Sequence, residues 1–154
     1  MSVIRTRKVF RIGYCVFVFI FLMIIFSGAN MAQQPAQQSE YLKEITTCKD
    51  ILEKDPLRET NIFFAQDEKV VSWFRFSYNA KEEFILKWEW ITPQGKLYHH
   101  GEIAMEAGNY DRYRTWYWIK IKDRYASKLP GEWKVKVYIN DSFLGEKHFY
   151  IIGS

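Results

Sequence analysis

Apolar and polar residues alternate in several short segments of this chain, and turn residues separate these segments. In Glu132–Ile139 every second residue is apolar, which places Trp133 and its apolar companions on one face. Glu83–Ile91 alternates in the same way, and Thr92-Pro93-Gln94-Gly95 follows it as a turn. A period of two residues is typical of a β-strand with one buried face. The chain is therefore predicted to build its core from sheets.

The same pattern predicts an all-β, antiparallel β-sandwich of about seven strands. No amphipathic helix lies between the alternating segments, which disfavours a parallel α/β sheet. Residues 43–51 fit a strand or a short helix, and their β-branched residues favour a strand. Pro56 and the polar residues up to Thr60 are expected to end this strand. The other expected strands are 69–78, 83–91, 96–105, 114–121, 132–139 and 143–152, with loops at 106–112 and 122–130.

Residues 1–32 have the order of charged, apolar and small residues that is typical of an export signal. Four basic residues precede the apolar run Ile12–Phe26, and small residues follow up to Ala32. This order predicts a secretory signal peptide that forms an apolar helix. The run is shorter than the roughly 20 residues that span a bilayer. Continued to Ala32 it reaches that length, so an uncleaved membrane anchor is the alternative.

Three regions follow from these patterns. Residues 1–32 are the signal peptide or anchor, residues 33–40 are a Gln-rich linker, and residues 41–154 are the β-sandwich domain. We expect the domain to be exported to the periplasm or outside the cell. If the first segment is not cleaved, residues 12–32 tether the domain to the inner membrane.

The net charge of the whole chain does not indicate what the domain binds. The formal net charge is +4, but residues 1–32 hold four of the 22 basic residues and none of the 18 acidic ones. The remainder is therefore electrically neutral. A neutral exported domain is not expected to bind nucleic acid, which attracts strongly basic surfaces.

Residues with catalytic or metal-binding chemistry are few. Cys48 is the only cysteine after the apolar segment, and we expect it to be a small buried hydrophobic residue rather than a reactive thiol. His99 and His100 are adjacent, and His148 lies far along the chain without a third ligand at a recognised spacing. No nucleophile or phosphate-loop motif occurs. We therefore expect no metal, no cofactor and no enzymatic activity.

Residues 131–152 contain the pattern G-x-W-x-V-x-V-Y, then L-G-E, then F-x-I. This pattern resembles the closing hairpin of secreted bacterial immunoglobulin-like domains of unknown function. Upstream segments that resemble the opening of the same domains are Ile45-Thr46-Thr47, Asp55-Pro56, Phe63-Phe64 and Trp73-Phe74-Arg75-Phe76. The resemblance implies an immunoglobulin- or fibronectin-like sandwich that acts as a non-catalytic module. Such domains carry many unrelated functions, so it implies little more.

Aromatic residues are the best candidates for a binding surface. All six tryptophans lie in the domain, and the alternation assigns Trp88, Trp90 and Trp133 to the core. The candidate binding residues are Trp73, Trp116, Trp118, Tyr110 and Tyr113, with the two tyrosines expected in a loop or at its border. They predict a protein partner in the cell envelope. The alternative is a carbohydrate-binding module that uses Trp116 and Trp118, or Trp73, as a platform. A third interpretation is that another segment covers these aromatics.

Overall fold

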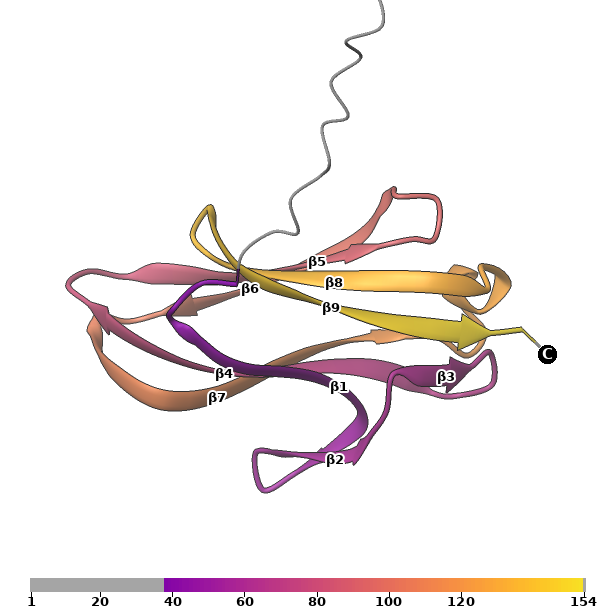
Figure 1. Cartoon of the computed structure of the whole chain (residues 1–154), viewed down its shortest axis with the longest axis horizontal. Coiled ribbons are helices and arrows are strands. Elements are labelled where there is room, and N and C mark those ends of the chain that lie inside the picture. Colours follow the sequence, from indigo (N-terminus) through magenta and orange to yellow (C-terminus); the bar gives the residue numbers. More distant parts are fainter. Residues whose placement is uncertain (1–37, 154) are drawn as a thin grey trace, which may run out of the picture. The chain divides into compact units, whose positions relative to one another are not determined.

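The computed structural model describes residues 38–153, which form nine strands and one short 3-10 helix (Figure 1). The predicted export segment and most of the predicted linker lie outside these residues. Across residues 38–153 we find no helix with the length and apolar character needed to span a membrane. The elements are β1 (Leu42–Leu52), β2 (Asp55–Glu59), β3 (Ile62–Phe64), β4 (Lys69–Ala80), β5 (Phe84–Ile91), β6 (Leu97–Met105), β7 (Gly108–Lys120), η1 (Tyr125–Lys128), β8 (Gly131–Ile139) and β9 (Ser142–Ile152).

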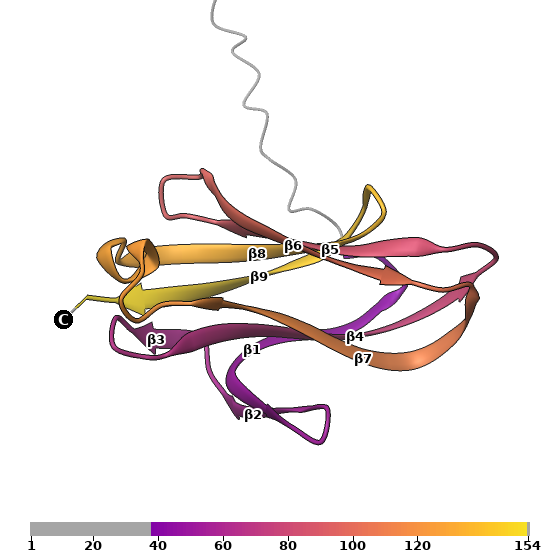
Figure 2. The ribbon, with the colours of Figure 1, turned by 180° about the vertical axis from the view of Figure 1, so that it is seen from behind.

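The strands form two sheets that pack face to face (Figures 1 and 2). The first sheet has the order β2-β1-β4-β7, and the second has the order β3-β9-β8-β5-β6. The chain passes from β4 to β5 in the other sheet, after which β7 returns to pair with β4 and β8 returns to pair with β5. Such Greek-key connections also build immunoglobulin-like sandwiches. The predicted two-sheet, all-β architecture is confirmed.

Two short strands, β2 and β3, explain why the structure has more strands than predicted. β2 forms from residues that were expected to end the preceding strand and to lie outside any strand, and it pairs with β1. β3 is parallel to β9, whereas all other paired strands in the described residues are antiparallel. The predicted loop at 106–112 is wrong from Gly108 onward, because β7 already pairs with β4 at Gly108 and Asn109. Residues 43–51 belong to β1, so the helix alternative is also wrong.

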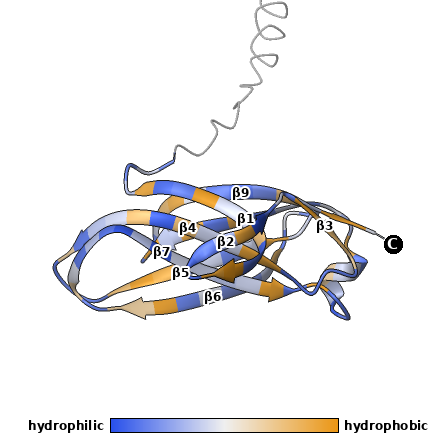
Figure 3. Ribbon diagram, turned by 90° about the horizontal axis from the view of Figure 1, so that it is seen from below, coloured by the Kyte–Doolittle hydropathy of each residue, from blue (hydrophilic) through white to orange (hydrophobic). Residues whose placement is uncertain are grey.

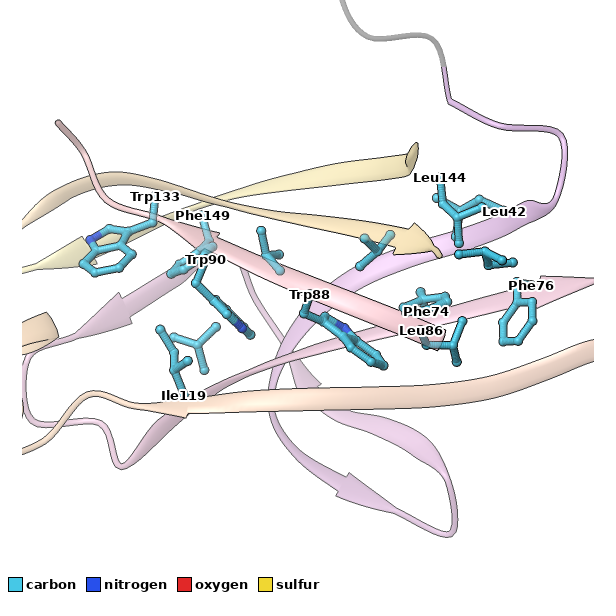
Figure 4. Packing of buried hydrophobic residues seen from close by; sticks show 14 of the residues in the cluster. Leu42, Phe74, Phe76, Leu86, Trp88, Trp90, Ile119, Trp133, Leu144 and Phe149 are labelled. Atoms are coloured by element: carbon cyan, nitrogen blue, oxygen red, sulfur yellow. The ribbon is translucent and has the colours of Figure 1, made fainter. Parts of the chain in front are cut away.

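Aromatic side chains fill the space between the sheets (Figure 4). Trp88, Trp90 and Trp133 are fully buried, as the alternation predicted. Phe74 from the first sheet packs against Trp88 from the second, with 5.2 Å between ring centroids. Figure 3 shows hydrophobic and hydrophilic segments following one another along the strands. This alternation gives each sheet one apolar face for the core.

One glycine is required where the open edges of the two sheets approach each other. Gly101 on β6 faces Tyr117 on β7, and the Tyr117 ring occupies the space that a Cβ atom at residue 101 would need. The ring of Tyr117 also lies 5.6 Å from that of Trp88 between centroids. Any side chain at residue 101 would therefore displace a ring that packs on the core.

Candidate binding surfaces

The three candidate tryptophans lie on the outer face of the first sheet, away from the second sheet. Trp73 on β4 pairs with Trp116 on β7, and one step along the same face Val71 pairs with Trp118. Their exposures differ greatly. Trp73 is 2% exposed, Trp116 is half-buried and Trp118 is 46% exposed. The pairing of β4 with β7 brings all three to one face, and their exposure depends on what covers that face.

The β1–β2 hairpin covers Trp73. In Figure 1, β2 and the turn that joins it to β1 lie below β4 and β7, on the side that faces away from β8 and β9. The Nε1 of Trp73 donates a hydrogen bond of 2.8 Å to the carbonyl oxygen of Lys54 in the hairpin turn. Next to Lys54, Asp55 accepts hydrogen bonds of 2.8 Å from Nη1 of Arg114 at both carboxylate oxygens. The prediction that Trp73 is available for binding is therefore wrong.

A second, smaller apolar cluster lies beneath this hairpin. It consists of buried Cys48, Val71 and Trp73, with partly buried Ile51 and Trp116 against them. The Sγ of Cys48 donates a hydrogen bond of 3.2 Å to the carbonyl oxygen of Asp50. Burial raises the pKa of the Cys48 thiol to about 11, so the thiol stays protonated at neutral pH. Cys48 is the buried hydrophobic residue that was expected.

Tyr110 and Tyr113 belong to β7 rather than to a loop or its border. Tyr110 is half-buried, its ring stacks 6.1 Å from that of Phe76, and its hydroxyl donates a 2.8 Å hydrogen bond to the carbonyl oxygen of Glu106. Tyr113 is exposed and lines a hollow of about 300 Å³ together with Trp116. Tyr110 therefore supports the fold, whereas Tyr113 and Trp116 share a surface hollow.

Trp118 lines a separate groove of about 400 Å³. Apart from the indole, its lining is charged. The lining contains four basic residues, Lys49, Arg58, Lys69 and Lys120, and two acidic residues, Asp50 and Glu68. The predicted platform of Trp116 with Trp118 is thus divided between two hollows of different character.

An apolar patch on the outer face of the second sheet was missed by the sequence analysis. The parallel pairing of β3 with β9 sets Ile62 beside Tyr150 and Phe64 beside Ile152. Each of these four side chains, which we call the edge patch, is between 42% and 44% exposed. Both strand segments are apolar at every position, so apolar side chains must stand on both faces. That lack of alternation is the signal that could have revealed the patch.

Side chains form hydrogen bonds with the backbone groups of β3 that point away from β9. The Oγ1 of Thr60 accepts a 3.0 Å hydrogen bond from the amide of Ile62 and donates one of 3.0 Å to the carbonyl oxygen of Ile62. The amide of Phe64 donates a 2.9 Å hydrogen bond to Oδ2 of Asp67. Exposed strand edges invite pairing with other strands. Because these hydrogen bonds cap the edge of β3, another strand cannot readily pair with it. The edge patch is therefore accessible on the face of the sheet.

A polar network borders the edge patch. The hydroxyl of Tyr150 donates a 3.0 Å hydrogen bond to Oε1 of Glu132. His148 places Nδ1 3.2 Å from Glu132 Oε1 and Nε2 2.9 Å from Glu146 Oε1. The hydrogen bonds from Tyr150 and His148 hold the pKa of Glu132 below its usual value. Among residues 38–153, no three histidine, cysteine or acidic side chains are placed to hold a metal ion.

Comparison with known proteins finds similarity only among solved structures. No protein-family model matches the chain, and no curated protein is significantly similar to it. An immunoglobulin-like protein from Pseudomonas aeruginosa is similar with a TM-score of 0.45 and 16% identity, over 75% of this chain and 98% of that one. The DNA glycosylase AlkC from Pseudomonas fluorescens, bound to DNA with an abasic site analogue, has a TM-score of 0.42 and 16% identity, over 70% of this chain and 30% of that one. Neither similarity is evidence for an activity of this chain.

Proposed function

We propose that the chain is an exported, non-catalytic β-sandwich module that binds a protein partner in the cell envelope through the edge patch. The observation that carries this proposal is the contiguity of four exposed apolar side chains on two paired strands. Contiguous apolar patches on the surface of a soluble domain mark interaction sites. Phe64 and Tyr150 add aromatic rings, which are enriched in protein interfaces.

The surroundings of the patch also favour a protein interface. Glu132 and His148 border it with groups that can form hydrogen bonds, and a polar rim around an apolar centre is typical of protein interfaces. Because Thr60 and Asp67 cap the edge of β3, the partner is expected to contact the face of the sheet rather than to add a strand. The export signal predicted for residues 1–32 supports a partner in the cell envelope.

Site-specific crosslinking in the cell tests this proposal. A photoreactive phenylalanine analogue replaces Phe64 in the full chain, and the same analogue replaces Ile85 in a control. Ile85 is 42% exposed on β5 of the same sheet, but it is not part of the edge patch. We expect one defined envelope protein to be crosslinked from position 64 and not from position 85. Equal patterns from both positions, or crosslinks between two copies of this chain alone, would contradict the proposal.

A pair of matched substitutions adds a second test. Ile62→Lys places a charge in the patch, whereas Ile85→Lys places the same charge on the same sheet outside it. Because both isoleucines are similarly exposed, we expect similar folding of the two variants. The crosslink from position 64 should be lost in Ile62→Lys and kept in Ile85→Lys. Its persistence in Ile62→Lys would show that the patch does not bind the partner.

A further inference from the structure

The groove around Trp118 lies on the other sheet and has a different chemistry from the edge patch. Lys120 follows Trp118 on the same outward face of β7, and Lys69 on β4 is paired with Lys120. Arg58 on β2 lines the groove from the hairpin. With Lys49 on β1, the basic side chains around this exposed indole come from all four strands of the first sheet.

Basic charge prevails in this groove because the carboxylates that line it are already paired. Asp50 accepts a hydrogen bond of 2.8 Å from Nζ of Lys69, and this bond is the main reason that its pKa is lowered. Glu68 accepts one of 3.1 Å from Nζ of Lys122. Each of these carboxylates is thus paired with a lysine, and Arg58 is attracted to Asp50 only from a longer distance.

Lys49 is paired with Asp67, so Lys120 and Arg58 are the basic side chains of the groove that remain. In the described part of the chain, neither has a carboxylate oxygen within 4.0 Å of its charged nitrogens. Arg58 also has a φ angle of 56°, a left-handed conformation that is uncommon outside glycine and is often found at functional sites. The groove thus offers two cations beside one exposed ring.

We propose that this groove binds an acidic saccharide, with one sugar ring stacked on the indole of Trp118 and its carboxylate paired with Lys120 and Arg58. A pyranose ring has an apolar face of C–H groups that packs on an aromatic ring. A carboxylate forms strong hydrogen bonds with guanidinium and ammonium groups. The volume of about 400 Å³ lies within the usual range for small-ligand sites.

Other anionic ligands fit this arrangement less well. Nucleic acids are bound by rows of stacking aromatic rings along a continuous basic track. Here one exposed indole stands on an electrically neutral domain. An acidic peptide would pair with the cations but would leave the face of Trp118 without a ring to stack on it. A uronic acid supplies both the apolar face and the negative charge on a single ring.

Calorimetric titration of the purified full chain tests the proposal with four matched probes. Tetragalacturonic acid is the acidic saccharide, maltotetraose the neutral one, tetraglutamate the acidic peptide and thymidine tetranucleotide the nucleic acid. We expect tetragalacturonic acid to bind at least about tenfold more tightly than each of the other three. We also expect this binding to weaken as salt is added, because ions screen exposed charges. Equal or tighter binding of any other probe, or no binding of tetragalacturonic acid, would overturn the proposal.

Four variants assign the binding to the groove. Trp118→Ala removes the ring and Lys120→Ala removes one cation, and both positions are exposed, so the fold should persist. Tyr125→Ala and Lys96→Ala are controls at exposed positions outside the groove. Each groove variant should raise the Kd for tetragalacturonic acid by about tenfold or more, and the controls should leave it unchanged. Unchanged binding in Trp118→Ala would overturn the stacked geometry.

Discussion

The indole nitrogen of Trp73 and the carbonyl oxygen of Lys54 are joined by a hydrogen bond of 2.8 Å. This bond ties the turn of the β1–β2 hairpin to the outer face of the first sheet. It also explains how a tryptophan that faces away from the main core can be almost fully buried. The hairpin and the sheet together enclose Cys48, which therefore reports on whether the hairpin is closed.

Trp73→Phe should open the hairpin more often. The substitution removes the donor and leaves the Lys54 carbonyl unpaired, which costs about 1–2 kcal/mol. Modification of Cys48 by a thiol reagent under native conditions should then be roughly 5- to 30-fold faster. Trp90→Phe is the control, because the Trp90 nitrogen has no hydrogen-bond partner in the described residues. Unchanged modification of Cys48 in Trp73→Phe would show that the hydrogen bond does not hold the hairpin.

The stability of the domain should fall at alkaline pH because of Cys48. Its pKa is about 11 in the folded domain against 9.0 for the free side chain. As the pH rises from 9 to 11, the unfolded chain therefore loses a proton that the folded domain keeps, and the free energy of unfolding decreases. Urea unfolding of the wild type and of Cys48→Ala across this range measures the effect.

The comparison with Cys48→Ala isolates this thiol from other groups. Burial also raises the pKa of Tyr138, to about 12, so both proteins should lose some stability at the highest pH values. Only the wild type should show the additional decrease that begins near pH 9. Parallel curves for the two proteins would mean that Cys48 titrates normally in the folded domain.

Gly101→Ala should destabilise the domain because the added methyl group meets the ring of Tyr117. Overpacking of this kind costs about 1–3 kcal/mol. Gly108→Ala is the matched control on β7, the next strand along the chain. There the added Cβ would lie at an ordinary distance of 3.7 Å from the Tyr110 ring. It should change the free energy of unfolding by less than about 0.5 kcal/mol. Equal effects in urea unfolding would show that Tyr117 can move aside at little cost.

Removal of the caps on β3 should make the domain self-associate. Thr60→Val combined with Asp67→Ala frees the amide and carbonyl of Ile62 and the amide of Phe64, and leaves the edge patch in place. Free strand edges pair with one another. Sedimentation velocity should then show species larger than those of the wild type, in amounts that rise with concentration.

The double variant also breaks the ion pair between Asp67 and Lys49, which measures 2.9 Å. Lys49→Ala removes this ion pair and keeps both caps, so it serves as the control. It should sediment like the wild type. If Lys49→Ala associates as strongly as the double variant, the loss of charge rather than the free strand edge is the cause.

The local alternation of apolar and polar residues was sufficient to predict the long strands. It was not sufficient to predict which outward side chains are exposed. The alternation in 132–139 predicted the burial of Trp133, because one period-two face of a strand must meet the core. The same rule could not reveal that Trp73 is buried, because the segment that covers it lies 19 residues away in the sequence. β3 escaped prediction because it has only three residues, and its partner β9 is distant in the chain.

The pairing of β3 with β9 joins Ile62 to Tyr150, which are 88 residues apart in the sequence. Contacts between such distant residues require a long loop to close, and the entropic cost of this closure is met before the contacts yield any stabilisation. During synthesis, β3 has no partner strand until β9, the last of the described strands, is present. The edge patch cannot form before β9 is present, so a chain interrupted before β9 would not display it. Binding through this patch would select modules that have completed folding.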